Sequence, residues 1–281
     1  MPNQLINFQH MLQADQSRAK VIAVASGKGG VGKTNISTNL SICLASAGKK
    51  TLLIDADFSL GNVDVLLNIN SKYNFSHVMN GLKTIEQIKY IGPMGVEIIC
   101  GTCGLERLAD MSQFERQRVI HQLQTLQKDA DYIIIDAAAG IGKSVSSLCL
   151  ASDQVLVITT PEPTAITDAY ALIKIMSGNN YKGTISLIVN MADSIAQGKK
   201  IFQQIAKVAR RFLNVNIHEA AILLNDDKVK LAVKTRKAAV LAYPRAQISL
   251  SITALSVKLS TGSPVNNSKN GFFRKVADLF F

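Results

Sequence analysis

Residues 27–34 read Gly-Lys-Gly-Gly-Val-Gly-Lys-Thr, a complete G-x-x-x-x-G-K-S/T phosphate-binding loop. The loop follows the apolar run Val21–Ala25, which predicts a buried strand, and precedes a segment of helical character, 35–47, that closes at Gly48. A strand, a glycine loop and a helix in this order are the context that the motif requires. The stretch therefore predicts a nucleotide site in an α/β fold.

The residue types of the loop suit phosphate binding. Its glycines let the backbone curl so that N–H groups face phosphate oxygens. We expect Lys33 to reach the β and γ phosphates and Thr34 to offer a hydroxyl to Mg²⁺, while the helix that begins here adds the positive end of its dipole. The expected nucleotide contacts in this stretch are Gly27, Gly29, Gly30, Val31, Gly32, Lys33, Thr34 and Asn35.

Apolar strand-like runs alternate with helical patterns along most of the 281 residues. Nearly continuous apolar strands separated by helices indicate an α/β fold with a mostly parallel sheet covered by helices on both faces, as in P-loop NTPases. Further strands are predicted at 51–55, 96–99, 132–136, 154–159, 185–190 and 220–224, and helices near 112–128, 164–176, 197–213 and 246–259.

Carboxylates follow the strands at the edge where parallel sheets bind ligands. Phosphoryl transfer asks the protein mainly for positioning and charge compensation. We therefore expect Asp55 and Asp136 near Mg²⁺, with Asp136 in its outer shell, and Asp57 at the attacking water. Gly140 is placed so that its N–H can sense a γ-phosphate. The alternative for each carboxylate is a helix or turn cap at a strand end.

The net charge of +11 is concentrated in the last third of the chain. Residues 198–281 hold 15 of the 31 basic residues and 4 of the 20 acidic ones, which leaves 16 of each in residues 1–197. Such asymmetry suggests a surface that faces anionic lipid, nucleic acid or an acidic protein. The alternative is a solvated basic surface without a dedicated partner.

The chain has neither a run of about 18 apolar residues nor a basic start followed by an apolar core. We therefore expect a cytoplasmic protein without a bilayer span. Among the four cysteines, Cys43 and Cys149 lie in apolar helical patterns, where a thiol acts as a small hydrophobe. Cys100 and Cys103 form a lone C-x-x-C, which indicates an ordinary strand-end loop or, alternatively, a redox or metal site.

The end of the chain changes character. Residues 260–271 are polar and rich in turn formers, which predicts a flexible tether. On a helix, the apolar residues of 272–281 would share one face and the charged ones would lie on the other. Such a tail can dock on its own domain, in a partner groove or in a membrane interface. We favour a reversible membrane contact, strengthened by two copies or by anionic lipid. The predicted membrane face is Phe272, Phe273, Val276, Leu279 and Phe280.

These observations predict four parts of the chain. They are an N-terminal extension (1–19), a P-loop ATPase domain (20–259), the tether (260–271) and an amphipathic membrane-targeting helix (272–281).

Three features together resemble the deviant Walker A ATPases of the MinD/ParA group. They are the loop with Lys28 after its first glycine, the segment Ile-Asp-Ala-Asp that ends at Asp57, and the segment Asp-x-x-Ala-Gly-Ile that begins at Asp136. The resemblance implies ATP hydrolysis with ATP/ADP and Mg²⁺, and a homodimer that forms with ATP. It implies that Lys28 reaches the partner's nucleotide and, with Lys33 and Asp57, acts in catalysis. It also implies Asn190 as an adenine contact, and we place Asp226 at the nucleotide as well.

Within that group, three segments resemble the flagellar number regulators of the FlhG/FleN type. They are residues 57–67, residues 231–244 and the Phe-rich tail. By this resemblance the protein would limit flagellar number and cycle between the cytoplasm and the cytoplasmic face of the inner membrane. Its implied partners are an FlhF-type GTPase, a flagellar transcription activator and switch-complex proteins.

The chain departs from the family pattern at Ala137 and Ala138, which stand where a polar residue and Gly or Pro are common. Asp15-Gln-Ser-Arg18 matches only part of the N-terminal segment with which some members stimulate their GTPase partner. Two alternatives stay open: a ParA-like DNA-partitioning ATPase, favoured by the basic last third, and an iron–sulfur scaffold relative that uses its cysteines.

Overall fold

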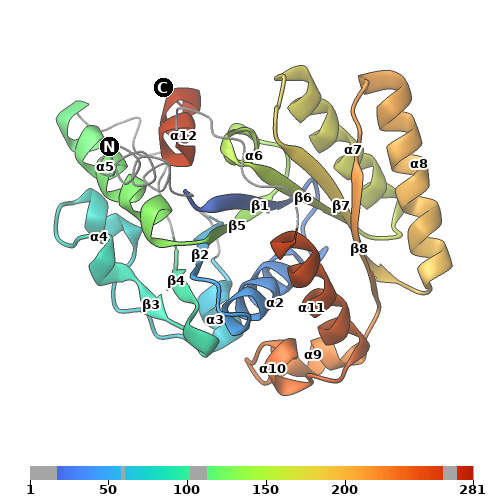
Figure 1. The fold of residues 1–281 in the computed structure, drawn as a ribbon, viewed down its shortest axis with the longest axis horizontal. Coiled ribbons are helices and arrows are strands. Elements are labelled where there is room, and N and C mark those ends of the chain that lie inside the picture. The colour runs from blue at the N-terminus through green and yellow to red at the C-terminus, as the bar shows by residue number, and fades with distance from the viewer. Residues whose placement is uncertain (1–17, 58–60, 102–112, 262–270, 281) are drawn as a thin grey trace, which may run out of the picture.

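The computed structural model describes residues 18–57, 61–101, 113–261 and 271–280. Within these ranges an eight-stranded sheet runs in the order β3-β4-β2-β5-β1-β6-β7-β8 (Figure 1). The strands are β1 (Lys20–Ser26), β2 (Thr51–Ala56), β3 (Tyr90–Ile91), β4 (Glu97–Ile99), β5 (Tyr132–Ala139), β6 (Gln154–Thr159), β7 (Thr184–Ala192) and β8 (His218–Leu224).

Neighbouring strands are parallel except at one edge, where β3 pairs antiparallel with β4. The predicted strands are confirmed within one or two residues at most ends. β5 is longer than predicted and continues to Ala139, because Ala137 pairs with Ala56 of β2 and Ala139 with Ser26 of β1. The sequence did not indicate β3, since two exposed residues give no apolar run.

The helices confirm the predicted segments and add short ones that carry little periodicity. The predicted helix after the phosphate-binding loop is α2, which is followed by Gly48 at a φ of 77°. The helices are α2 (Lys33–Ser46), α3 (Val63–Leu67), α4 (Phe75–Met79), α5 (Gln113–Asp129), α6 (Lys143–Ala151), α7 (Pro163–Gly178), α8 (Ile195–Leu213), α9 (Asp227–Lys234), α10 (Ala239–Ala242), α11 (Gln247–Ser260) and α12 (Phe272–Phe280), with 3₁₀ turns at Glu86–Ile88 and Pro93–Gly95.

Two apolar clusters, one on each face of the sheet, form the core. Because side chains alternate along a strand, Val21 and Ala23 of β1 join one cluster, whereas Ile22 and Val24 join the other. The first cluster is completed by α4 to α8 and α12, and the second by α2, α3 and α9 to α11. Helices therefore cover both faces of a mostly parallel sheet, as predicted (Figure 1).

The C-terminal helix packs on its own domain. α12 contacts α5 and α6, and Phe272, Phe273 and Val276 are at most 3% exposed. In this conformation the tail docks on its own domain, which is one of the three alternatives that the sequence left open, and the membrane contact stays a prediction. Of the other residues on this helix, Ala277 is buried and Leu279 is 38% exposed. The physical reason for this docking is burial of apolar surface, because Phe272, Phe273 and Val276 belong to the same apolar cluster as Val119 and Leu123 of α5 and Val145 of α6.

Several expectations fall on residues outside the described ranges. They concern residues 262–270 of the tether, residues 15–17, Cys103 and the side chain of Phe280. Arg18 is described, and its guanidinium pairs with Asp153 at 2.6 Å. Within the described residues, no helix combines the length and apolar character that crossing a bilayer would require.

Candidate nucleotide site

The residues singled out in the sequence meet at the carboxyl ends of the central strands. The phosphate-binding loop connects the end of β1 to the start of α2, and Asp55 at the end of β2 stands in register with Asp136 of β5. Since the strands are parallel and adjacent, their ends meet at one edge of the sheet. Topology thus brings together residues that are about eighty positions apart in the chain.

Two glycines of the loop are required by their surroundings. A Cβ on Gly27 would lie 2.5 Å from the backbone oxygen of Asp168 in the first half of α7. A Cβ on Gly32 would lie 2.5 Å from Nδ2 of Asn190, and Gly32 has a φ of 93°, which side chains other than hydrogen rarely allow. The loop is therefore packed tightly between α7 and the end of β7.

Lys33 is enclosed within the site. Its side chain is 8% exposed, and Nζ donates a hydrogen bond to Oγ of Ser26 at 3.1 Å. Burial lowers the pKa of Lys33, whereas the nearby charges of Asp136 and Asp57 oppose that shift. An ammonium group confined in this way favours an anionic ligand, because phosphate oxygens would replace the lost hydration.

Asp136 is a buried carboxylate that suits a bound cation. Burial raises its pKa to about 7. Hydrogen bonds from Thr34 and Ser37 and the charge of Lys33 oppose this shift, because they favour the carboxylate. Its Oδ1 is buried and has no hydrogen-bond partner among the described residues. Mg²⁺ takes few protein ligands and completes its shell with water and phosphate oxygens. A buried carboxylate oxygen beside the hydroxyl of Thr34 fits that ion.

Asp55 has a structural task at the same edge. Its carboxylate accepts hydrogen bonds from the backbone N–H groups of Asp57 at 3.1 Å and Val63 at 3.2 Å, and burial raises its pKa to about 6. These bonds connect the end of β2 to the start of α3, so the turn-cap alternative describes its present contacts. Its role at the metal stays a prediction. Within the described ranges, no three His, Cys, Asp or Glu side chains group around one point.

Gly140 and Asp57 flank the phosphate-binding loop. Gly140 has a φ of 109°, and its N–H donates to the backbone oxygen of Ser26 at 3.0 Å. To contact a γ-phosphate, this N–H has to leave that oxygen. Asp57 follows β2 directly and is close enough to Lys33 to affect its pKa. The structure thus brings both residues to the loop, while their roles stay predictions.

Asn190 and Asp226 lie on the side of β7 and β8. Asn190 is 7% exposed, and its Nδ2 donates to the backbone oxygen of Val31 at 2.8 Å. Its neighbour Met191 has a φ of 57°, and the ladder to β8 is irregular at this point. Asp226 caps α9 by accepting from the N–H of Lys228 at 2.9 Å. Asp226 also lines a pocket of about 510 Å³ next to Tyr243.

Lys28 lies against the start of α7. Its Nζ is 2.5 Å from Oε2 of Glu162 and 2.9 Å from Oγ1 of Thr164. Neither of these two residues was predicted from the sequence, and Ser26, which contacts Lys33, was not predicted either. A signal was available for Glu162 and Thr164, because they lie within five residues after the predicted strand 154–159, whose carboxyl end points to the same edge.

The family is decided by comparison with known proteins. Residues 19–187 match the family described as AAA domain, which is more than half of the chain. The chain belongs to this family, as a MinD/ParA-type ATPase. It is 37% identical over 242 residues to the antiactivator FleN of Pseudomonas aeruginosa, with 86% of each chain covered. It is 35% identical over 254 residues to the flagellum site-determining protein YlxH of Helicobacter pylori, with 89% of this chain and 86% of YlxH covered.

Solved structures agree on the fold of this ATPase. The septum site-determining protein MinD of Pyrococcus horikoshii, complexed with Mg-ADP, has a TM-score of 0.70 at 20% identity, and the match covers 86% of this chain and 96% of MinD. ATP with Mg²⁺ is the cofactor of the MinD/ParA-type ATPase, and ATP hydrolysis is its reaction. In this chain, Lys33 and the N-terminus of α2 are the groups that would hold the phosphates, and Thr34 and Asp136 are those that would face the metal; these roles stay predictions.

The three cysteines within the described ranges are buried thiols. Cys43, Cys100 and Cys149 are buried, and burial raises the pKa of both Cys100 and Cys149 to about 12. Their thiols therefore stay protonated at neutral pH, which is unfavourable for metal binding. This agrees with a packing role for Cys43 and Cys149. The C-x-x-C alternative is not tested, because Cys103 lies outside the described residues.

We predict that Asn190→Asp lowers ATP affinity about tenfold or more and removes the preference of the ATPase for ATP over GTP. The Oδ1 of Asn190 has no donor among the described residues, so it is available to an adenine amino group, whereas Nδ2 holds the loop. An aspartate would place an oxygen against the oxygen of Val31, and such unsatisfied buried pairs cost about 1–3 kcal/mol. Competition with a fluorescent nucleotide measures both effects.

Asn39→Asp is the matched control. Nδ2 of Asn39 also donates to a backbone oxygen, that of Asn35 at 2.7 Å, and the residue is 1% exposed. It should reduce stability without changing the ratio of ATP to GTP affinity. An unchanged ratio in Asn190→Asp would contradict the assignment of Asn190 to the base.

Proposed function

We propose that the protein is an ATP-driven regulator of flagellar number that dimerises with ATP and binds membrane reversibly through α12. The observation that carries the flagellar part is its similarity to FleN and YlxH, which covers at least 86% of each chain involved. One relative is named as an antiactivator and the other as a site-determining protein, and both names suit a switch that counts or places flagella. An FlhF-type GTPase, a flagellar transcription activator and switch-complex proteins are the partners that we propose.

The membrane part is supported by the composition of α12. A nine-residue helix with Phe272, Phe273 and Val276 on one side and Arg274 and Lys275 on the other is suited to a lipid interface. In the described conformation that apolar side is covered by α5 and α6. Membrane binding therefore requires α12 to leave its site. Burial of three apolar side chains stabilises the docked state by at most several kcal/mol, at about 1.5–3 kcal/mol each.

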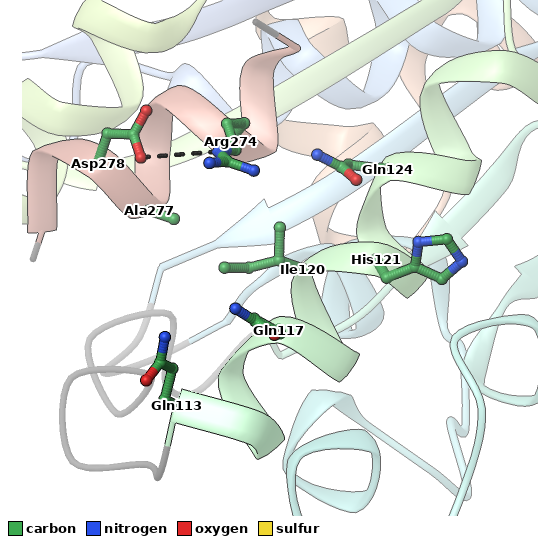
Figure 2. A pocket seen from close by; sticks show the side chains of 8 residues that line it. All are labelled: Gln113, Gln117, Ile120, His121, Gln124, Arg274, Ala277 and Asp278. Carbon is green, nitrogen blue, oxygen red and sulfur yellow. Dashed lines mark ion pairs between the residues drawn. The ribbon is translucent and has the colours of Figure 1, made fainter.

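A cavity beside α12 marks one side of this docking site. A hollow of about 670 Å³ is lined by residues of α12 and α5. Figure 2 shows these side chains, and the ion pair between Arg274 and Asp278 on the α12 side has a nitrogen–oxygen distance of 3.9 Å. This hollow is separate from the nucleotide site, because its lining residues belong to α5 and α12 and none of them belongs to that site. The contact between α5 and α12 is thus incomplete along this edge, which supports a helix that can separate from the domain. The lining residues are Gln113, Gln117, Ile120, His121, Gln124, Arg274, Ala277 and Asp278.

We predict that removal of 271–281 abolishes lipid binding. In the Asp57→Ala background with ATP and Mg²⁺, the full-length protein should sediment with vesicles of anionic lipid, and the truncated protein should stay in the supernatant. Phe114→Ala is the control, because Phe114 is a 79% exposed phenylalanine on α5 that should not contribute. Equal sedimentation of the full-length and truncated proteins would reject the membrane assignment.

A DNA-partitioning role is the second candidate, since the last third carries the basic excess. Nonspecific DNA binding that appears with ATP and weakens steeply with salt would favour it. For the flagellar role, the decisive measurement is the number of flagella per cell after deletion of the gene. An unchanged number would exclude the proposed function.

A further inference from the structure

The start of β1 meets the start of α12 at the edge of the sheet opposite the nucleotide site. The N–H of Ala19 donates to the backbone oxygen of Gln127, near the end of α5, at 2.8 Å. Gly271, directly before α12, packs on the side chain of the same glutamine, since a Cβ on Gly271 would lie 2.6 Å from Oε1 of Gln127. Arg18, which precedes Ala19, is therefore brought next to the first turn of α12.

A single carboxylate, that of Asp153, lies among basic side chains at this edge. Its Oδ1 is 2.6 Å from Nη2 of Arg18, and its Oδ2 accepts from the N–H of Val21 at 2.9 Å. The side chains of Arg18 and Asp153 are only 16% and 9% exposed. The charge of Asp153 also acts on Lys20 of β1 and on Lys275 of α12. Among the described residues, positive charge is thus in excess in a half-buried place.

Lys275 is half-buried on α12, and its charge is poorly compensated there. Burial lowers the pKa of Lys275, and the charge of Arg18 lowers it further, by more than the charge of Asp153 opposes the shift. The contacts of Asp153 explain this order, because both of its oxygens are already engaged by Arg18 and Val21. A cation that loses hydration without full compensation costs free energy. Docking of α12 therefore carries this cost against the burial of its apolar side chains.

We propose that Arg18 is a positioning residue for α12, because it occupies Asp153 and repels Lys275 and thereby weakens the docking of the C-terminal helix. When Arg18 is drawn away, Asp153 becomes available to Lys275, and α12 is held more tightly. A partner that binds the segment before Arg18 would thus change the fraction of undocked α12, and the reverse effect has the same size. Its consequence for membrane binding rests on the proposed function.

The expected effect is moderate. Charge interactions at partly exposed positions shift an equilibrium by about twofold to fivefold. The burial of Phe272, Phe273 and Val276 is larger, so α12 stays mainly docked in either case. The charges at this edge therefore adjust the undocked fraction, and they leave the fold of the domain unchanged.

The test measures hydrogen–deuterium exchange of residues 272–279 in the full chain, without lipid or nucleotide. Lys275→Gln should slow this exchange about twofold to fivefold, because a repelled charge is removed. In the Arg18→Gln background the same substitution should leave the exchange unchanged or speed it, because Lys275 then has Asp153 as its partner. Arg18→Lys retains the charge and should behave as the unsubstituted protein does.

Arg274→Gln is the matched control on the same helix. The side chain of Arg274 is 62% exposed and pairs with Asp278 at 3.9 Å, so its replacement should have the same effect with and without Arg18→Gln. An equal effect of Lys275→Gln in both backgrounds would overturn the inference, with melting temperatures used to establish that each variant is folded.

Lys275→Glu tests the same charges without any change at Arg18. It should slow the exchange more than Lys275→Gln does, because an anion would face the excess of positive charge. Faster exchange in Lys275→Glu would contradict the inference. Because these measurements contain no lipid, their failure leaves the membrane assignment intact. If Arg18 and Lys275 are coupled but the full-length protein does not sediment with anionic vesicles, the proposed membrane function fails and the coupling stands.

Discussion

Replacing Lys28 with alanine should abolish ATP-dependent dimer formation and lower partner-stimulated ATP hydrolysis by a factor on the order of 10³ or more. Cations that a second subunit adds to a phosphoryl-transfer site contribute about 10³ to 10⁵ in rate. The folded protomer should barely change, because the contacts of the Lys28 side chain within the described ranges are an exposed ion pair and one hydrogen bond, which contribute at most about 1 kcal/mol. Light scattering after size exclusion and a phosphate-release assay measure the two effects.

Asp57→Ala is the informative counterpart. If Asp57 orients the attacking water, its loss should slow hydrolysis strongly while the ATP-bound dimer accumulates. Asp57 is near Lys33, as the effect of its charge on the Lys33 pKa shows, so it is close to the phosphates that Lys33 is expected to hold. Normal turnover in both variants would show that neither residue has its assigned role. Loss of dimers in Asp57→Ala would indicate a role in assembly.

The second large effect concerns Asp136 and pH. In the protein without Mg²⁺, Asp136→Asn should be more stable than the unsubstituted protein at pH 8, and the advantage should largely disappear at pH 4. Burial raises the pKa of Asp136 from 3.8 to about 7. Between these values the unfolded chain has lost its proton while the folded chain retains it. The free energy of unfolding therefore falls as pH rises through this window, on the order of a few kcal/mol.

Urea unfolding at several pH values, with the difference between the two proteins taken at each, isolates this group from the other titrating residues. Mg²⁺ should reduce the difference in stability between the two proteins at pH 8. The cation offsets the buried charge of Asp136 in the unsubstituted protein, and the Asp136→Asn variant has no such charge. Asp55 is present in both proteins, and it should make the stability of each fall with rising pH to a smaller extent, since its pKa is raised to about 6. A difference that does not vary with pH would contradict an ionising buried Asp136.

Much of the fold was predictable because apolar periodicity is a local property. The runs around Val21, Leu53 and Ile134 have to be buried on both sides, and only a central sheet with helices on both faces provides that environment. The phosphate-binding loop was predictable for the same reason, since its glycines and its lysine act within eight residues. Features without a local pattern, such as the two-residue strand β3, could not be predicted.

The candidate site was predictable in its own residues and not in their partners. Lys28 could be singled out from its position in the loop, but its contact with Glu162 joins residues that are 134 positions apart. Ser26 is another case, because a serine before a glycine loop has no recognisable signal until Nζ of Lys33 is found beside it. The orphaned oxygen of Asp136 likewise exists only once β5 is buried among its neighbours.

The order of residues alone determined that this protein binds nucleotide phosphate and folds as a parallel α/β sheet, because the loop and the strands are encoded by contiguous side chains. It also determined that the last ten residues form an amphipathic segment. Only the tertiary structure decided where that segment lies: Phe272 and Phe273 are covered by α5 and α6, since an apolar face binds whichever apolar surface is nearest. Periodicity specifies such a face but not its partner.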